Sequence, residues 1–401
     1  MKILFLTDNF PPEVNAPANR TFEHCREWVK HGGEVTVVTC FPNFPGGKIY
    51  DGFRHKLFQR ENIEGINVIR VWTYVSPNKG IVRRSLDYLS FGIASFIVGL
   101  FSSCNLIVAT SPQFFTAVSA GAISVLRRKK FVFEVRDLWP ESIIGVDVMK
   151  KNIVIHILSW IEKLLYQRAW RIIVVSEAFT DSIVARGVNR NKIHCISNGI
   201  DRNVFSPQKR NEVLVEKLKL ENKFIVGYMG THGMAHKLDF IINSISNIND
   251  NSLHFIFIGE GAKKEKLVMQ AEKLELKNIT FINNVSRDEV PAYLSLLDIG
   301  LINLRKSEAF EKVIPSKLFE LAAMEIPVLL GVQGEAQKLL MKYNAGTCFE
   351  PENKDDFISK LMDLKNNSRL REEVKAGAAL LAKDFNRKML AQKMFELLRS
   401  K

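Results

Sequence analysis

The chain has 401 residues, an apolar content of 46% and a mean hydropathy of -0.01. These values exclude an intrinsically disordered chain and a multi-spanning membrane protein, and the length favours two or three domains over a single core. The formal net charge of +13 indicates phosphate-rich partners, a class that includes nucleic acid, anionic lipid and phosphorylated ligands.

The five cysteines are scattered along the chain and form no C-x-x-C pair. We therefore expect a reduced, cytoplasmic setting with neither a disulfide framework nor a zinc site. The sequence starts directly with a strand-like run, Lys2–Thr7, without a basic region followed by a cleavable apolar segment. No secretory signal is predicted.

Short apolar runs alternate with amphipathic segments, which predicts parallel sheets with helices on both faces. The first strand, Lys2–Thr7, is followed by a proline-rich loop and the start of a helix, Asp8–Arg20. Ligands of open α/β sheets bind at the carboxyl ends of strands, so this segment is a candidate wall of a binding site. The alternative is that Arg20 is an exposed helix residue. A G-x-G-x-x-G motif does not follow the strand, so dinucleotide binding is not expected.

The second predicted strand, Glu34–Thr39, leads into a loop rich in aromatic residues, proline and glycine, Phe41–Tyr50. Such loops are often functional, and aromatic side chains can cover the apolar face of a sugar ring. A self-packed surface loop is the alternative.

An uncharged span then predicts a helix, a strand and a second helix: Tyr88–Phe101, Leu106–Thr110 and Phe114–Leu126. The first helix is expected to be too short to cross a bilayer. Arg83 and Arg84 precede it, and such a basic flank is typical of a helix seated in the plane of an anionic membrane. The alternative is a buried core helix, which we slightly favour for most of its residues, with one face free to touch lipid.

A strand beginning at Phe131 ends in three ionisable residues, Arg136, Asp137 and Glu141. Residues at the carboxyl end of a strand are well placed to take part in catalysis. The competing interpretation is a buried ion pair that organises the turn. A helix over about Asn152–Ala169 and a strand at Arg171–Ser176 complete this sheet, and we expect a domain boundary near residue 205.

The second half repeats the alternation. Its predicted strands are Phe224–Met229, Leu253–Ile258, Ile279–Ile282, Ile299–Ile302 and Val328–Leu330. The fragment Gly259-Glu260-Gly261 is more typical of a turn than of a phosphate loop.

The segment Ile314–Gly331 predicts a turn, a short helix and a buried strand. Ser316, after Pro315, can begin the helix, where backbone N–H groups and the positive end of the helix dipole favour a phosphate, and Lys317 adds a full charge. Glu320 lies one turn further on, where a carboxylate can accept two ribose hydroxyls. A capped core helix with an incidental lysine and glutamate is the alternative.

Nearly the whole chain resembles the retaining family-four glycosyltransferases of the GT-B fold, in the branch that builds bacterial capsule and O-antigen repeat units. The motifs that carry the resemblance are Asp8–Pro12, Ala16–Arg20, Phe41–Gly47, Arg136–Glu141, Ser197–Asp201 and Pro315–Lys317 with Glu320. The strongest similarity is to transferases of N-acetyl-L-fucosamine from its UDP form.

The resemblance implies an α/β chain with two Rossmann-like domains facing across a cleft. Residues 1–205 would form an acceptor-binding, membrane-facing domain and residues 206–383 a nucleotide-sugar-binding domain. Residues 384–401 would form a helix that packs back toward the first domain.

The resemblance also implies roles for particular residues. The implied catalytic residues are Lys317, Lys237, Arg136 and Asp137, the last as the first suspect for a protein nucleophile. The implied donor-binding residues are Gly230, Thr231, His236, Lys312, Ser316 and Glu320, and the acceptor-binding ones are Asn15, Asn19, Arg20, Phe44 and Glu141.

The sequence departs from the family pattern in two places. Lys312 stands where the family often has a second glutamate, and Thr231 stands where it has an arginine. The lysine that accompanies this arginine falls at His236 or Lys237.

The implied reaction is metal-independent, needs no cofactor and transfers the sugar from UDP to an undecaprenyl-diphosphate-linked saccharide at the inner face of the cell membrane. No nucleic-acid partner is expected, because the positive charges are dispersed. The alternatives are a UDP-N-acetylglucosamine 2-epimerase-like enzyme and a non-enzymatic basic, membrane-associated binding protein.

Overall fold

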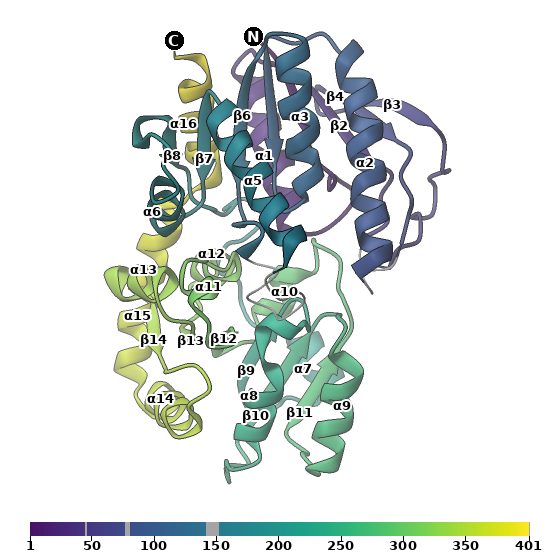
Figure 1. The fold of residues 1–401 in the computed structure, drawn as a ribbon. Helices are drawn as coiled ribbons and strands as arrows, with labels where there is room; N and C mark the ends of the chain where they lie inside the picture. Colours follow the sequence, from purple (N-terminus) through teal and green to yellow (C-terminus); the bar gives the residue numbers. More distant parts are fainter. Residues whose placement is uncertain (45, 77–80, 142–151, 401) are drawn as a thin grey trace. The chain divides into compact units, whose positions relative to one another are not determined.

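The computed structural model describes residues 1–44, 46–76, 81–141 and 152–400. The chain divides into two compact units (Figure 1). Unit 1 comprises Met1–Ser197 and Arg387–Lys401, and unit 2 comprises Asn198–Asn386. The acceptor and donor roles assigned to residues 1–205 and 206–383 stay predictions.

The described part of unit 1 contains an eight-stranded sheet of order β3-β4-β2-β1-β5-β6-β7-β8. Its strands are β1 Lys2–Leu6, β2 Glu34–Cys40, β3 Phe58–Ile63, β4 Ile66–Val71, β5 Leu106–Thr110, β6 Lys130–Val135, β7 Arg171–Val174 and β8 Ile193–Cys195. All neighbours pair in parallel except β3 and β4, an antiparallel edge pair. The sequence predicted the five central strands and missed β3, β4 and β8.

Helices cover both faces of this sheet (Figure 1). They are α1 Ala16–Lys30, α2 Ile81–Phe101, α3 Phe114–Leu126, α5 Ile153–Arg168, α6 Glu177–Val184 and α16 Arg387–Arg399. Helix α16 packs on α1, where Trp28 Nε1 donates to the Ala391 carbonyl at 2.9 Å and the Trp28 and Phe395 rings stack at 6.3 Å. The prediction that the C-terminal helix returns to the first domain is confirmed.

Helix α2 begins at Ile81 rather than at Tyr88. By length and composition its segment Arg83–Phe101 is long and apolar enough to cross a membrane, which corrects the expectation that it is too short. One such helix is weak support for a span, and α2 packs as a sheet-covering helix against α3, β2 and β4.

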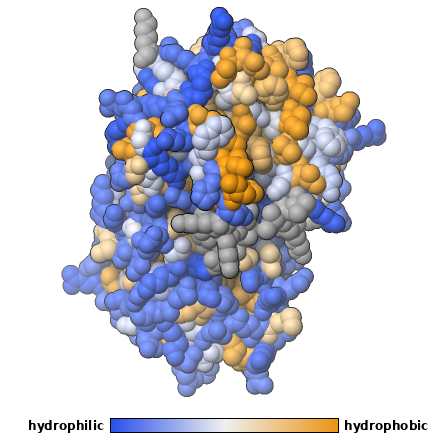
Figure 2. Space-filling view, viewed as in Figure 1, coloured by the Kyte–Doolittle hydropathy of each residue, from blue (hydrophilic) through white to orange (hydrophobic). Residues whose placement is uncertain are grey.

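Large apolar side chains of unit 1 are exposed on three helices, α2, α3 and α5, with α3 in contact with both of the others. Figure 2 shows apolar residues gathering over these helices. We call this surface the apolar face. Its residues are Leu86, Leu89, Ile93, Ile97, Phe101, Val125, Leu126, Ile153, Val154, Ile157, Trp160 and Leu164.

The described part of unit 2 contains a six-stranded parallel sheet of order β11-β10-β9-β12-β13-β14. Its strands are β9 Phe224–Met229, β10 Leu253–Ile258, β11 Ile279–Ile282, β12 Ile299–Asn303, β13 Val328–Gly331 and β14 Gly346–Cys348. The first five match the predicted strands closely, because each is a short, mostly apolar run, and all but the half-buried edge strand β11 are largely buried.

Two apolar clusters cover the two faces of this second sheet. One contains residues of α7 Glu212–Leu218, α10 Val290–Leu294, α12 Lys317–Ala323, α13 Glu335–Tyr343 and α15 Ser368–Asp384. The other contains residues of α8 Leu238–Ile245, α9 Lys264–Lys273 and α14 Lys354–Asn366. Two parallel Rossmann-like sheets and a C-terminal helix that contacts the first define the GT-B fold.

Candidate active site

The side chain of Lys317 lies over Gly230 at the end of β9. A Cβ atom at Gly230 would lie 2.1 Å from Lys317 Cε and 2.3 Å from its Nζ, and the φ angle of Gly230 is +141°. Lys317 Nζ also lies 5.4 Å from the centroid of the Tyr228 ring, a cation–π arrangement. The structure therefore brings together two predicted site elements that are far apart in the sequence, and a glycine leaves the room for the lysine.

Helix α12 begins where the sequence predicts. Ser316 is its N-cap residue, and the Ser316 hydroxyl makes no capping hydrogen bond. The apolar side of the helix, including Leu318 and Phe319, is buried. Burial lowers the pKa of Lys317, and the Glu320 carboxylate one turn on opposes that shift. The helix thus fills the core, as the alternative interpretation expected, while Lys317 extends to the strand end.

The loop between β9 and α8 carries two buried histidines. Burial first, and then the charge of Lys317, lowers the pKa of His236 to about 3. Burial and the Lys264 charge lower the pKa of His232 to about 4. Both rings are therefore neutral at pH 7 in the chain without a ligand, and the role of His236 as the cation of the family pattern stays a prediction.

A short helical turn of this loop, η2 Met234–His236, precedes Lys237. Asn303 Nδ2 fixes the turn by donating to the His236 carbonyl at 2.9 Å, and Tyr228 Oη donates to the Thr231 carbonyl at 2.8 Å. The sequence reasoning missed Asn303. Its position at the end of β12 is the signal that could have found it.

Lys237 Nζ lies 3.1 Å from Asp239 Oδ2 and lines a cavity of about 390 Å³ in unit 2. Lys263, Lys266 and Arg305 line the same cavity. Of these four residues, only Lys237 was predicted as a site residue. Lys312, another predicted site residue, lies at the end of the short helix α11 Glu308–Glu311. The cavity concentrates positive charge beside the β9–α8 loop.

The Gly259-Glu260-Gly261 fragment packs against the same loop. A Cβ atom at Gly259 would lie 2.0 Å from the Gly230 carbonyl oxygen, and one at Gly261 would lie 2.5 Å from that of His232. These glycines therefore permit backbone-to-backbone packing of two loops, which agrees with the interpretation as a turn.

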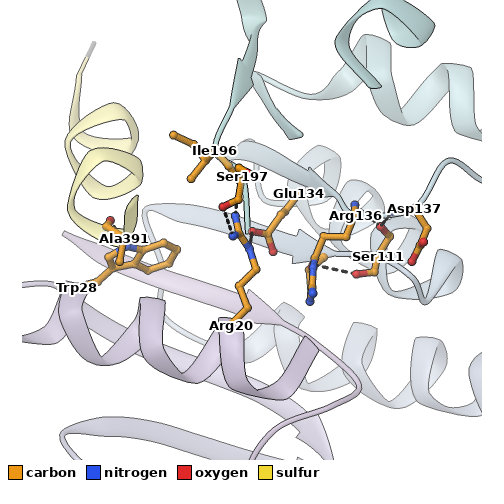
Figure 3. Close-up of polar contacts among 10 residues, drawn as sticks. Arg20, Trp28, Ser111, Glu134, Arg136, Asp137, Ile196, Ser197 and Ala391 are labelled. Atoms are coloured by element: carbon orange, nitrogen blue, oxygen red, sulfur yellow. Dashed lines mark hydrogen bonds and ion pairs between the residues drawn. The ribbon is translucent and has the colours of Figure 1, made fainter. Parts of the chain in front are cut away.

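In unit 1, Arg20 is buried and fully engaged by its own chain (Figure 3). Its Nε donates to Glu134 Oε1 at 2.9 Å, Nη1 to the Ser197 carbonyl at 2.7 Å and Nη2 to the Ile196 carbonyl at 2.8 Å. The alternative of an exposed helix residue is wrong. Arg20 ties α1 to β6 and to the segment after β8, and its contact with an acceptor stays a prediction.

Arg136 and Asp137 lie directly after β6. The Ser111 hydroxyl oxygen accepts hydrogen bonds from the backbone N–H of Arg136 at 2.7 Å and of Asp137 at 3.1 Å (Figure 3). Burial raises the pKa of Asp137 to about 6 despite the opposing charge of Arg136. Burial lowers the pKa of Arg136 to about 10, which leaves it protonated at pH 7.

Glu141, also predicted for this turn, pairs with Arg186 rather than with Arg136. Arg186 Nη2 lies 2.5 Å from Glu141 Oε1, and Arg186 Nη1 pairs with the buried Glu162. Glu141 therefore forms an ion pair, but its side chain is 41% exposed, so this is not the buried ion pair of the competing interpretation. Its contact with an acceptor stays a prediction.

The remaining predicted acceptor residues lie at the start of α1 and in the loop after β2. Asn15 caps α1 by accepting from the Ala18 N–H at 2.9 Å, and Asn19 is half-buried on the first turn. The Phe44 carbonyl accepts from Tyr50 Oη at 2.6 Å, a contact within the loop.

Glu13 is a residue of this region that the sequence reasoning missed. Its Oε1 accepts from the backbone N–H of Asn43 at 2.8 Å and of Phe44 at 2.9 Å, so it holds the loop after β2. Burial raises its pKa to about 7. The signal was present in the sequence as an acidic residue in a proline-rich segment after a strand.

Among the described residues, no group of three or more His, Cys, Asp or Glu side chains could hold a metal ion. The expectation of metal-independent chemistry stays a prediction.

Comparison with known proteins gives the class of enzyme that this fold carries. Residues 18–204 match the family described as Glycosyltransferase Family 4, and residues 209–380 match Glycosyl transferases group 1. The chain belongs to the family-4, group 1 glycosyltransferases.

The chain is 24% identical to a protein of Escherichia coli (strain K12) named as a colanic acid biosynthesis glycosyl transferase, WcaI, over 93% of this chain and 95% of that protein. It is 26% identical to TuaH of Bacillus subtilis (strain 168), named for teichuronic acid biosynthesis, over 49% of each chain. Among solved structures it is similar to Anabaena Alr3699/HepE in complex with UDP and glucose, with a TM-score of 0.76, 16% identity and full coverage of both chains. The chain is thus a distant relative of glycosyltransferases of polysaccharide biosynthesis.

Proposed function

We propose that the protein transfers an amino-deoxy sugar from a UDP donor to a lipid-diphosphate-linked saccharide during assembly of a surface polysaccharide. The observation that carries this proposal is the placement of Lys317 over Gly230, beside the start of α12. The solved complex of HepE with UDP and glucose, and relatives named for colanic and teichuronic acid biosynthesis, support the donor class and the pathway type. The choice of N-acetyl-L-fucosamine rests on the sequence resemblance alone.

The proposed donor site lies in unit 2. The diphosphate would lie at the backbone of Ser316 and against Lys317, while the Glu320 carboxylate would accept the ribose hydroxyls. Burial of Lys317 reduces its hydration, so less water has to be displaced when a phosphate oxygen approaches it. Lys237 would add charge to the departing diphosphate, and Lys312 is a further candidate.

The chemistry follows from where charge develops. The bond between the anomeric carbon and the diphosphate oxygen breaks, an acceptor hydroxyl oxygen bonds to that carbon from the same side, and its proton passes to the departing phosphate. Preorganised cations and backbone N–H groups stabilise the growing negative charge on UDP. A covalent intermediate on Asp137 is the alternative, and isolation of glycosylated Asp137 after donor trapping would establish it.

We also propose that unit 1 seats on the inner face of the cell membrane, where a lipid-linked acceptor resides. The apolar face, twelve large side chains on α2, α3 and α5, supports this. Exposed basic residues border it, with Arg83 at the start of α2, Arg128 after α3 and Lys163 on α5. An apolar surface with a basic border suits the interface of an anionic bilayer.

One assay tests the catalytic proposal. Purified protein is incubated with UDP-sugars and GDP-sugars, with and without lipid-diphosphate-linked mono- and disaccharides, and products are read by mass spectrometry. We expect product only with a UDP-amino-deoxy sugar and the lipid-linked acceptor. Interconversion of a UDP-sugar without acceptor would instead identify a 2-epimerase, and absence of any turnover across the panel would contradict the proposal.

A second assay tests the membrane seat by sedimentation with anionic phospholipid vesicles. Ile93→Ser with Ile97→Ser, or Trp160→Ser, should reduce the bound fraction at least several-fold, because each removes apolar area from the apolar face. The charge reversal of both arginines, Arg83→Glu with Arg84→Glu, should also reduce the bound fraction, because anionic lipid would then repel this end of α2. Val213→Ser and Met269→Ser, at exposed apolar positions of unit 2, are the matched controls. Equal sedimentation of all variants would refute the membrane seat.

A further inference from the structure

Arg136 is a half-buried cation with two buried donor atoms that the described residues leave unused. Its Nε and Nη1 are buried and have no hydrogen-bond partner among the described residues. A buried guanidinium without partners is costly, because it has given up hydration without gaining hydrogen bonds in return. The backbone of Arg136, in contrast, is held in place, because its N–H donates to the Ser111 hydroxyl oxygen (Figure 3).

The neighbouring charges are already paired with one another. Glu134 Oε1 accepts from Arg20 Nε at 2.9 Å, and Glu23 Oε2 accepts from Arg387 Nη1 at 2.7 Å. The second oxygen of Glu134 is itself buried without a partner, so Glu134 makes no hydrogen bond to Arg136. The Nε and Nη1 donors of Arg136 therefore remain unused within this cluster.

Two further groups face this cluster without using these donors. Burial raises the pKa of Asp137 to about 6 against the opposing charge of Arg136, so its carboxylate is ionised at pH 7 and balances charge, but it accepts no hydrogen bond from Arg136 Nε or Nη1. His24, whose Nε2 is also buried and unpartnered, stays neutral at pH 7, because burial and then the Arg20, Arg387 and Arg136 charges lower its pKa. The cluster thus offers unused N–H donors on a protonated guanidinium, and such donors suit an oxygen anion.

The position of Arg136 in the sheet is one where ligands bind. It follows the carboxyl end of β6, next to β5, and β5 and β1 are the adjacent strands at which the order of the sheet reverses. In open α/β sheets the ligand crevice lies outside the carboxyl ends of strands near this switch point. A guanidinium there presents fixed N–H donors that match phosphate and carboxylate oxygens.

We propose that Arg136 binds an acidic group of the acceptor, a phosphate or carboxylate oxygen, through its unused Nε and Nη1 donors. This inference rests on the proposed function, since it supposes an acceptor held by unit 1. The acidic group has two chemical sources: the diphosphate that links the saccharide to its lipid, or a carboxylate on the saccharide itself. In either case Arg136 selects the acceptor by charge.

The test compares three acceptors. The first is a saccharide on a lipid diphosphate, the second is the same saccharide as a neutral alkyl glycoside, and the third is that alkyl glycoside with one sugar replaced by its uronic acid. Wild type, Arg136→Met and Arg136→Lys are assayed for kcat and for KM of the acceptor. Arg190→Met, which removes the same charge from an exposed position of unit 1, is the matched control.

We expect Arg136→Met to raise the acceptor KM at least tenfold for the acceptor that bears the recognised anion and less than threefold for the neutral one. Arg136→Lys should show an intermediate KM, because it keeps the charge and loses the fixed donors. The acceptor whose KM responds identifies the source of the anion. Equal KM changes for acidic and neutral acceptors, or none, would overturn the proposal.

Two further measurements keep the inference separate from the proposed function and from folding. Titration with inorganic pyrophosphate, in a protein whose UDP site is saturated with UDP, should show an additional binding event that Arg136→Met loses and Arg190→Met keeps. If no sugar transfer is found but this event is present, the proposed function fails and the anion site stands. If Arg136→Met and Arg136→Lys both retain the wild-type pyrophosphate affinity, the anion site is refuted.

Discussion

Arg20 in unit 1 and Lys317 in unit 2 are both cations beside strands of a Rossmann-like sheet, yet their surroundings differ. Arg20 gives its donors to Glu134 and to two backbone carbonyls, so its charge is satisfied within the chain. Lys317 instead lies over a glycine and an aromatic ring, and burial lowers its pKa. A cation whose hydrogen-bond donors are all used within the chain stabilises the fold, whereas a cation that lies over a glycine at a strand end is well placed to bind a ligand.

The largest expected effect is on unit 1. Arg20→Met should reduce the free energy of unfolding by about 3–5 kcal/mol, because it leaves the buried Glu134 carboxylate without its partner. Chemical unfolding followed by tryptophan fluorescence measures this, since all five tryptophans lie in unit 1. The double variant Arg20→Met with Glu134→Leu should recover part of the loss. If Arg20→Met alone were as stable as wild type, the contrast between a structural Arg20 and a ligand-binding Lys317 would fail.

The second prediction concerns turnover in unit 2. Lys317→Ala should lower kcat by about 10²–10³-fold, the usual cost of removing a preorganised group that stabilises developing negative charge. Tryptophan fluorescence should show unchanged unfolding of unit 1. Lys338→Ala, which removes an exposed lysine from the same unit, should keep wild-type kcat. Similar kcat values for Lys317→Ala and Lys338→Ala would contradict the assignment of Lys317.

These effects could be anticipated from the sequence to different degrees. Central strands such as β9 and β10 were predicted because continuous apolar runs are local signals. The edge strand β3 and its neighbour β4 were missed because exposed residues alternate along β3 and its pairing with β4 depends on a turn at Glu64 and Gly65, both with positive φ. Lys317 and Glu320 could be predicted as site residues because they lie at the start of one short helix, one turn apart. The burial of Arg20 could not be found, because its partner Glu134 lies 114 residues away.

A third prediction sharpens the role of the glycine. Gly230→Ala should lower kcat by about 10²-fold, because its Cβ would displace the Lys317 side chain from the strand end. Gly187→Ala is the control for backbone strain alone, since Gly187 also has a positive φ of +83° and nothing within 4 Å of its Cβ position. It should cost about 1 kcal/mol of stability without changing kcat. A fully active Gly230→Ala enzyme would show that the close approach has no functional role.

The last prediction concerns the dependence of stability on pH. Because the pKa of His236 is lowered to about 3, the folded protein takes up no proton there between pH 6.5 and pH 4, whereas the unfolded chain does. Stability is therefore lost as pH falls, by at most about 1.4 kcal/mol per pH unit for this group. Glu13 has the opposite sign: its pKa is raised to about 7, so its contribution is lost as pH rises from 4.5 to 7.

Nuclear magnetic resonance of histidine-labelled protein measures the His236 effect directly. The His236 ring signals, assigned with His236→Asn, should not move between pH 5 and pH 8. A titration midpoint above pH 6 would contradict the neutral ring and reopen His236 as a cation for the diphosphate.

The most direct test of the central claim is calorimetric titration of the protein with UDP. The account predicts binding to wild type with a Kd below about 1 mM, the upper range for enzyme substrates. It predicts at least tenfold weaker binding to Glu320→Ala, which loses the ribose contact, and unchanged binding to Lys338→Ala. Absence of UDP binding at millimolar concentration, or equal affinity of Glu320→Ala and wild type, would contradict a nucleotide site at α12.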